Sequence, residues 1–399
     1  MSERKIIIVG SQDEVYEELP PKNIELYVIQ LSSLIGPRLR AAAKEIYEID
    51  TFEDEQVLTG ARYFCDRHKI DGLFSFTEYG LLPAANAAKT LALPGISAEV
   101  TELCRHKWKL REKLAATPLN IPFMMCDNRS AITQFAGKNG FPLVLKDPSG
   151  VGSINVKICY SLAEALGFYD ELLQQGYACV LAEKYVGGKE YSVETLSIRG
   201  SHQLIGVTDK YLLPGGLVEQ KHVYPANLTV DKWTRIEQYT FRLLELIQHH
   251  HGPMHIEIKI EDDLISLIEI NNRPGGDYIW DMVNKVSGVN LIAETLKYAF
   301  DGKPDLKERK ERCRYGAMSY IALFKPISIS TIEQSLNDMT VLERVQCKEY
   351  SESSELEIKS SFDRSGFILI GDNSISDLYG VISSIEAWIE CQSHQQVGV

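Results

Sequence analysis

The chain has 399 residues, of which 44% are hydrophobic and 24% charged, and its formal net charge is −13. This is the composition of an ordinary globular protein, long enough for two to four packed lobes. The acidic charge argues against a nucleic acid or an anionic membrane surface as the main partner, because both favour a basic surface.

Other features of the sequence bear on location. No run approaches the roughly 18 apolar residues of a membrane span. The apolar segment near Met1 is too short for a secretory signal. The eight cysteines have no CxxC spacing, which is consistent with reduced thiols. We therefore expect a cytoplasmic protein.

The first 97 residues alternate between strand and helix patterns, which predicts a parallel sheet in an α/β domain. Strands are expected at 5–10, 24–30 and 71–77, and helices near 33–48, 53–69 and 82–91. Although the first strand ends in Gly10, the GxGxxG pattern of a dinucleotide loop is absent. The sequence therefore gives no reason to place a nucleotide there.

A helix rich in cations is expected over 101–116. Its cations are Lys107, Lys109, Arg111 and Lys113, and a solvated charged face would explain all of them. A strand at 141–146 then leads into the sequence DPSGVGS at 147–153, followed by a strand at 155–160 and a helix from Ser161. Two glycines give this loop exposed N–H groups that can close over phosphates, although such a loop is weak evidence by itself.

The segment VLAEKYV at 180–186 predicts a strand that turns into a linker at 187–190. Backbone groups of such a linker can bind an adenine edge while apolar side chains enclose the ring. As the alternative, Glu183 and Glu190 are ordinary exposed carboxylates. Two strands joined at Arg199-Gly200 follow.

The segment 213–225 is expected to be a loop that contains one histidine, His222. A lone histidine is usually structural or simply exposed. The three histidines at 249–251 cannot share one helical face. We interpret them as the end of a helix and not as a metal site.

The segments 255–260 and 264–271 alternate apolar and polar residues on either side of an acidic turn, which predicts a β-hairpin. An odd loop centred on Asp263 would pair Ile256 with Ile270 and Ile258 with Ile268. The same register puts Glu257 opposite Glu269, with Asn271 on the same face, whereas a two-residue loop would scatter these three side chains.

Carboxylates that face each other across two strands require a compensating cation. Two carboxylates and an amide oxygen form a hard-oxygen ligand set suited to Mg²⁺. For an isolated hairpin, a solvated polar face is the simpler interpretation. The sequence NRPGG at 272–276 favours a site instead, because it adds the guanidinium of Arg273 and a glycine pair that lets the backbone approach a ligand.

The remaining sequence is expected to be helical over 281–300. Strands near 315–324, 342–350 and 366–370 and a helix over 374–389 follow, with no catalytic motif among them.

The spacing of Glu257, Glu269, Asn271 and Arg273 closely resembles the magnesium signature of the ATP-grasp superfamily, whose members activate a carboxylate as an acyl phosphate and pass it to a nucleophile. The resemblance is strongest to the L-amino-acid ligases and is sharp between residues 107 and 276. It implies a multidomain α/β and α+β chain with the ATP-grasp fold. The implied parts are an N-terminal Rossmann-like (pre-ATP-grasp) α/β domain at 1–97, a lid subdomain with its leading helix at 98–182, a central domain at 183–325 and a small C-terminal α+β subdomain at 326–399.

The resemblance also implies roles for individual residues. Mg²⁺, expected as two ions with Mn²⁺ as a substitute, would be held by Glu257, Glu269 and Asn271. The residues expected to contact ATP are Lys107, Lys146, Ser149, Gly150, Gly152, Ser153, Glu183, Lys184, Tyr185, Val186 and Glu190, the last at the ribose. Arg273, helped by His222 and the backbone of Gly276, would hold the carboxylate and stabilise the tetrahedral intermediate.

Substrate choice is expected to depend on Glu219 and Asp277. Asp277 follows the glycine pair, where its carboxylate would bind a substrate ammonium or a basic side chain. Alternatively it caps the helix that begins near Tyr278, since aspartate is a preferred N-cap residue.

The activity that the resemblance implies is ATP-dependent ligation of two L-amino acids into a dipeptide, with release of ADP and phosphate. The resemblance also implies a homodimer as one possible assembly. One alternative is another ATP-grasp enzyme, such as a purine-pathway ligase or a biotin-type carboxylase. The other is a non-catalytic nucleotide-binding protein. Three converging magnesium ligands argue against the latter, because a pure binder has little need for them.

Overall fold

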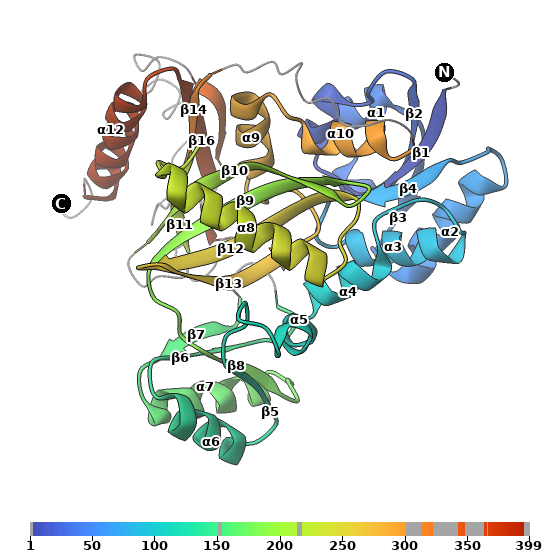
Figure 1. The fold of residues 1–399 in the computed structure, drawn as a ribbon. Helices are drawn as coiled ribbons and strands as arrows, with labels where there is room; N and C mark the ends of the chain where they lie inside the picture. The colour runs from blue at the N-terminus through green and yellow to red at the C-terminus, as the bar shows by residue number, and fades with distance from the viewer. Residues whose placement is uncertain are drawn as a thin grey trace.

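The computed structural model describes residues 3–150, 154–213, 218–300, 313–321, 342–347, 363–364 and 366–394. The described residues form three β-sheets with helices packed on them (Figure 1). Among these residues, no helix combines the length and the apolar character needed to cross a bilayer.

The N-terminal sheet has the strand order β3-β2-β1-β4, and every neighbouring pair is parallel, as predicted. Its strands are β1 (Arg4–Val9), β2 (Ile24–Leu31), β3 (Ala43–Ile49) and β4 (Gly72–Ser75). The accompanying helices are the 3-10 turns η1 (Asp13–Glu18) and η2 (Ser32–Leu34) and the α-helices α1 (Pro37–Ala42), α2 (Asp54–Cys65) and α3 (Leu81–Thr90). The helix expected at 33–48 is wrong in its second half, because that segment forms the edge strand β3.

The lid sheet has the order β5-β8-β6-β7, and its neighbours are antiparallel. It contains β5 (Phe123–Cys126), β6 (Leu143–Lys146), β7 (Val156–Cys159) and β8 (Val180–Lys184), with α6 (Arg129–Asn139) and α7 (Leu162–Gln174) packed on it. The preceding helical segment is broken at His106 into α4 (Ala98–Arg105) and α5 (Lys107–Leu114). Lys107 therefore begins a helix.

The central sheet has eight antiparallel strands in the order β13-β12-β9-β10-β11-β14-β16-β15. The strands are β9 (Lys189–Ile198), β10 (Ser201–Leu212), β11 (Glu219–Tyr224), β12 (Gly252–Glu261), β13 (Leu264–Asn271), β14 (Tyr315–Ile321), β15 (Leu342–Cys347) and β16 (Gly366–Asp372). The last three strands extend this sheet and do not form a sheet of their own. The segment predicted as a loop around His222 is wrong in part, because 219–224 form the strand β11.

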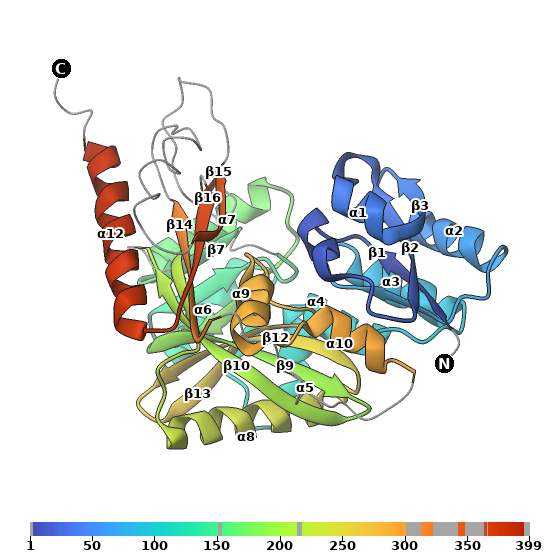
Figure 2. The same cartoon turned by 90° about the horizontal axis from the view of Figure 1, so that it is seen from above.

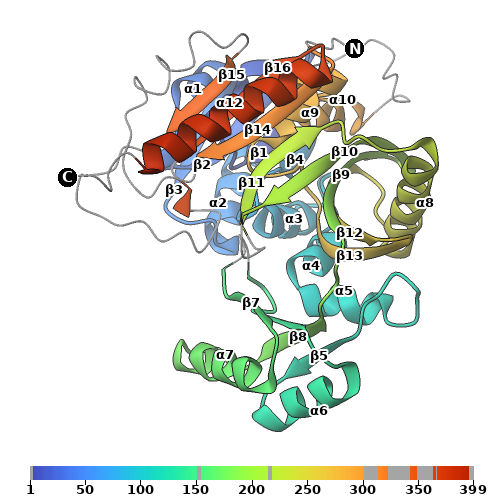
Figure 3. The ribbon, with the colours of Figure 1, turned by 90° about the vertical axis from the view of Figure 1, so that its left-hand side faces the viewer.

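In the part of the chain that the structure describes, four helices pack on the central sheet. They are α8 (Val230–Leu246), α9 (Ile279–Ser287), α10 (Leu291–Tyr298) and α12 (Ile375–His394). On one face, Ile236 and Leu243 of α8 pack against Val193 and Ile256 of the sheet. Helix α12 lies across β14 and β16 (Figure 3).

Helix α10 joins the central sheet to the N-terminal domain. Figure 2 shows this helix between the two parts, and its Ile292 and Leu296 belong to the same apolar core as Ile6 and Phe74. Burying a large aliphatic side chain stabilises a fold by roughly 1.5–3 kcal/mol, so this contact holds the N-terminal domain against the rest of the protein.

The hairpin β12–β13 keeps the predicted register at the end that matters for the site. Ile256 pairs with Ile270, and Glu257 pairs with Glu269. The prediction fails nearer the turn, where Ile258 pairs with Leu267. The turn has two residues, Asp262 and Asp263, and a β-bulge at Ile268 supplies the extra residue that restores the register.

Candidate active site

A cleft lies between the lid and the central sheet. Most residues expected to contact ATP line this cleft, namely Lys107, Lys146, Gly150, Glu183, Lys184, Tyr185, Val186 and Glu190. The apolar side chains Val144, Ile158, Leu212 and Ile268 line it as well. A cleft with apolar walls and a few convergent polar groups is the usual form of a small-molecule or cofactor site.

The loop after β6 is tied to the start of α5. Nζ of Lys107 donates to the carbonyl of Gly150 over 2.6 Å and lies 3.5 Å from Oε2 of Glu269. The Ser149 hydroxyl bonds to Nδ1 of His106 over 3.0 Å and does not line the cleft. Lys107 thus connects this loop to the acidic hairpin. Gly152 and Ser153 lie outside the described residues.

A buried ion triad fixes Lys146. Oε1 of Glu183 accepts a hydrogen bond from Nε of Arg111 over 2.7 Å, and its Oε2 lies 2.7 Å from Nζ of Lys146. All three side chains are at most 6% exposed. Burial alone would raise the pKa of Glu183, but the two cations lower it to about 2. The interpretation of Arg111 as part of a solvated helix face is therefore wrong, and so is that of Glu183 as an exposed carboxylate.

The resemblance assigns the segment 183–186 to the adenine, but two backbone amides of this segment already have protein partners. The N–H of Lys184 donates to the carbonyl of Pro122 over 3.0 Å, and the N–H of Tyr185 donates to that of Pro142 over 3.3 Å. These amides are not available to an adenine edge.

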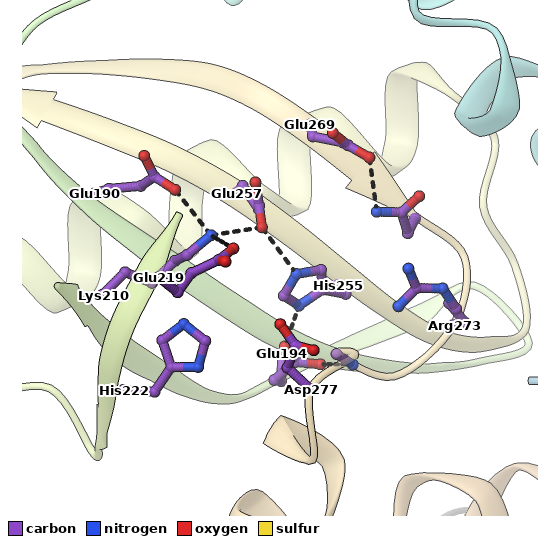
Figure 4. A network of polar contacts seen from close by, with 12 residues as sticks. Glu190, Glu194, Lys210, Glu219, His222, His255, Glu257, Glu269, Arg273 and Asp277 are labelled. Atoms are coloured by element: carbon purple, nitrogen blue, oxygen red, sulfur yellow. Dashed lines mark hydrogen bonds and ion pairs between the residues drawn. The ribbon is translucent and has the colours of Figure 1, made fainter. Parts of the chain in front are cut away.

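The facing pair Glu257 and Glu269 lies on adjacent strands (Figure 4), and both residues line this cleft. Nδ2 of Asn271 donates to Oε1 of Glu269 over 3.3 Å, which brings the third predicted ligand to the same carboxylate. Among the described residues, no three His, Cys, Asp or Glu side chains form a metal-binding group. Two carboxylates and one amide nevertheless suit Mg²⁺, which usually takes its other ligands from water and substrate phosphates.

Lysines already neutralise these carboxylates. Nζ of Lys210 is 2.7 Å from Oε1 of Glu257 and 2.8 Å from Oε1 of Glu190. Lys107 has the corresponding place at Glu269. The predicted need for a cation is therefore met by the protein itself, and no sequence pattern selects Lys210 for this place.

His255 connects the acidic pair to the glycine pair Gly275-Gly276. Its Nε2 is 3.4 Å from Oε1 of Glu257, and its Nδ1 bonds to Glu194, whose other oxygen accepts the N–H of Gly275 over 3.1 Å. Burial alone would lower the pKa of His255, but the two carboxylates raise it to about 9. A Cβ at Gly275 would lie 2.8 Å from Oε1 of Glu194, so the close approach requires glycine.

Arg273 leaves β13 toward the N-terminal domain. Its Nε donates to Oε2 of Glu78 over 2.8 Å, and Arg105 donates to the other oxygen over 3.2 Å. Burial alone would raise the pKa of Glu78, but Arg273 and Arg105 hold it below its ordinary value. Gly276 lies beside this group, because a Cβ there would meet Nη1 of Arg273 at 3.5 Å.

His222 is 1% exposed and hydrogen-bonds through Nδ1 to the Tyr320 hydroxyl over 3.0 Å. That hydroxyl donates its one proton to the carbonyl of Asp277 over 3.0 Å. In the hydrogen bond between Tyr320 and His222, the proton is therefore on Nδ1 of His222. Nε2 then has a lone pair and no hydrogen-bond partner among the described residues. Burial, with the charge of Lys210, lowers the pKa of His222 to about 3. The ring is therefore neutral at physiological pH.

Asp277 does not cap α9, so the capping interpretation is wrong. The N-cap residue is Tyr278, which adopts a left-handed conformation with no side-chain cap, and Asp277 also has a positive φ of 52°. The Asp277 carboxylate instead lies 2.7 Å from Nη2 of Arg364, whose Nη1 is 3.4 Å from Oε2 of Glu219. Arg364, 6% exposed, therefore joins the two residues expected to govern substrate choice.

The sequence does not predict three of these partners. Glu194 and Lys210 approach the hairpin only through strand pairing in the sheet, and Arg364 reaches Asp277 only through long-range packing. One available signal was a carboxylate within the strand-forming sequence YSVETLSI, since a buried carboxylate needs a partner.

Comparisons with known proteins bear on the family and the fold. The model of the ATP-grasp domain matches residues 139–281. A solved structure of L-amino acid ligase from Bacillus licheniformis superimposes with a TM-score of 0.81 at 21% identity, covering 97% of this chain and 98% of that one. An ADP complex of N5-carboxyaminoimidazole ribonucleotide synthetase superimposes with a TM-score of 0.73 at 15% identity, covering 99% of each chain.

Similar sequences include three proteins. An uncharacterized protein, y4rH of Sinorhizobium fredii, is 28% identical over 67% of this chain and 57% of its own length. Carnosine synthase 1 of Homo sapiens is 23% identical over 60% of this chain, and the match spans 32% of that enzyme. The L-arginine-specific L-amino acid ligase of Bacillus subtilis is 22% identical over 69% of this chain and 68% of its length.

Residues 139–281 therefore match the ATP-grasp domain, and the chain has the ATP-grasp fold. Within that class, its similarities include L-amino acid ligases in both sequence and structure.

Proposed function

We propose that the protein is an ATP-dependent carboxylate–amine ligase that joins two L-amino acids through an aminoacyl phosphate. One observation carries the proposal: the acidic pair Glu257 and Glu269 lines the cleft, and four residues after Glu269 the chain reaches Arg273, which Glu78 of the N-terminal domain holds in place. We therefore assign phosphate activation to the hairpin and carboxylate binding to the segment that directly follows it.

In the proposed reaction, a carboxylate oxygen of the first amino acid attacks the γ-phosphorus of ATP and ADP leaves. The amine of the second amino acid then attacks the acyl carbon, phosphate leaves and the amine loses a proton. Such chemistry depends on positioning and charge neutralisation and needs no covalent nucleophile on the protein. Mg²⁺, when bound at Glu257, Glu269 and Asn271, would neutralise phosphate charge.

The protein's own residues would position the substrates. Lys107 and Lys146 face the cleft and would hold phosphate oxygens. Arg273 would hold the reacting carboxylate through its guanidinium group. The neutral His222 would accept a hydrogen bond from an ammonium donor through Nε2, because a pKa of about 3 makes it a poor carrier of a proton.

A screen for phosphate release over pairs of amino acids tests the proposal, with mass spectrometry of the products. We expect ATP-dependent phosphate release with some amino-acid pairs and a product heavier than either amino acid. Bicarbonate and purine precursors serve as controls, since the fold also resembles a purine-pathway synthetase. Turnover with those controls alone would replace the proposal, and nucleotide binding without any product would favour a non-catalytic protein.

A further inference from the structure

Lys210 lies among the carboxylates of the candidate metal site. Figure 4 shows its ammonium group between Glu190 and Glu257. A third carboxylate, that of Glu219, lies 3.6 Å away. The lysine side chain is 2% exposed, and its strand β10 pairs with strands on both sides. The ammonium group is therefore held in place by packing and has little contact with solvent.

The two proposed carboxylate ligands differ in how they are neutralised. Lys210 contacts Glu257 at hydrogen-bond distance, 2.7 Å, whereas Lys107 lies 3.5 Å from Glu269. His255 adds a second cationic partner to Glu257 at 3.4 Å. A divalent ion that binds Glu257 must therefore share this carboxylate with a fixed ammonium group or displace it. Like charges at such distances repel strongly in a site with little water.

A buried ammonium group cannot leave its carboxylates unless another acceptor is supplied. The phosphate groups of a nucleotide would be such an acceptor, because Lys210 lines the same cleft as Lys146 and Lys107. Free metal brings no acceptor for the lysine. Metal with a nucleoside triphosphate brings three phosphates.

We propose that Lys210 makes divalent-metal binding at Glu257 depend on nucleotide. In the metal-free protein the ammonium group holds Glu257 and Glu190, and metal alone binds weakly. With nucleotide and metal both present, Glu257 would bind the metal, and the ammonium group of Lys210 would turn to a phosphate oxygen. This inference rests on the proposed nucleotide and metal site.

Direct binding of Mn²⁺ tests the inference without any turnover. Free Mn²⁺ is measured by electron paramagnetic resonance, with and without a non-hydrolysable ATP analogue. In Lys210→Gln we expect Mn²⁺ alone to bind about tenfold more tightly than in the wild type, and the gain on adding nucleotide to fall by about the same factor. An unchanged affinity for Mn²⁺ alone overturns the inference.

Lys259→Gln is the matched control. Lys259 lines the same cleft and lies 3.7 Å from Glu190, but among the described contacts it has no ion pair with Glu257. Its substitution removes the same charge and should change the affinity for Mn²⁺ alone less than about threefold. An effect equal to that of Lys210→Gln overturns the inference, because general charge would then explain both.

Two further variants keep the test decisive. Glu190→Gln with Lys210→Gln removes one charge of each sign, so it serves if Lys210→Gln alone does not fold. Compared with Glu190→Gln alone, it should bind Mn²⁺ about tenfold more tightly, and equal affinities overturn the inference. Glu269→Gln tests the metal site itself. If this variant binds Mn²⁺ with nucleotide as tightly as the wild type, the metal site is refuted. If it binds Mn²⁺ more weakly but Lys210→Gln leaves the affinity for Mn²⁺ alone unchanged, only the role of Lys210 is refuted.

Discussion

Replacing Glu183 with glutamine should destabilise the lid, because it leaves Arg111 and Lys146 facing each other without an anion. The pKa of this carboxyl falls from 4.5 to about 2 in the folded protein, which corresponds to about 3 kcal/mol of stability at neutral pH. Since the folded pKa is depressed, this contribution is present above pH 4.5 and is lost as the pH falls toward 2. Breaking a buried ion pair by removing one partner typically costs about 3–5 kcal/mol, in agreement.

Urea unfolding at pH 7.5 measures the effect, followed by both circular dichroism and tryptophan fluorescence so that departures from two-state behaviour are visible. Arg129→Gln is the matched control, because it breaks an exposed lid pair with Asp170 whose side chains are 55% and 44% accessible. The control should lose no more than about 1 kcal/mol. If Glu183→Gln loses no more than the control, the stabilising role of the buried triad is refuted.

Four other outcomes are expected. Glu269→Gln should reduce ADP formation about 100-fold or more with little change in melting temperature, because the side chain is only partly buried; turnover at the wild-type rate would contradict the metal assignment. Arg273→Lys should slow the acyl step about 100-fold and leave nucleotide affinity within about threefold, since lysine lacks the bidentate fork; loss of ATP binding would make Arg273 a nucleotide residue. His255 has a folded pKa of about 9, because its two carboxylate neighbours raise the pKa against the effect of burial. Its contribution to the stability of the metal-free protein is therefore complete below pH 6.5 and is lost as the pH rises through 9. In EDTA, the melting temperature of His255→Gln should decline less over that pH range than that of the wild type, and equal slopes would refute the charge on His255. Arg364→Gln should increase the preference for basic first amino acids by freeing Asp277, and Asp277→Asn should decrease it; an unchanged ranking in both variants would remove Asp277 from substrate selection.

The sequence predicted the acidic end of the hairpin because strand periodicity depends on local pattern alone. Ile256 and Glu257 found their expected partners, since side chains alternate with a period of two. The bulge at Ile268 could not be predicted in this way. It depends on backbone hydrogen bonding, and Arg111, 157 residues earlier in the chain, donates to the carbonyls of Leu267 and Ile268.

Other errors have similar causes. The edge strand β3 carries Lys44, Glu45 and Glu48, whose spacing also suits an exposed helix face. His222 lies on β11, but turn residues before it predicted a loop. The cation that joins Glu219 and Asp277 comes from Arg364, and no local pattern connects residues so far apart in the chain.

The two-residue turn and the bulge of the β12–β13 hairpin together have a consequence for comparing relatives. One additional turn residue, accompanied by loss of the bulge, would give the longer-turn register and leave Glu257 opposite Glu269. A turn residue can thus replace the bulge residue, provided that the total number of turn and bulge residues stays the same. A homologue whose alignment shows one extra residue at Asp262-Asp263 and one residue fewer near Ile268 can therefore keep the same pair of carboxylates, and should be judged by the strand pairing beyond Ile268.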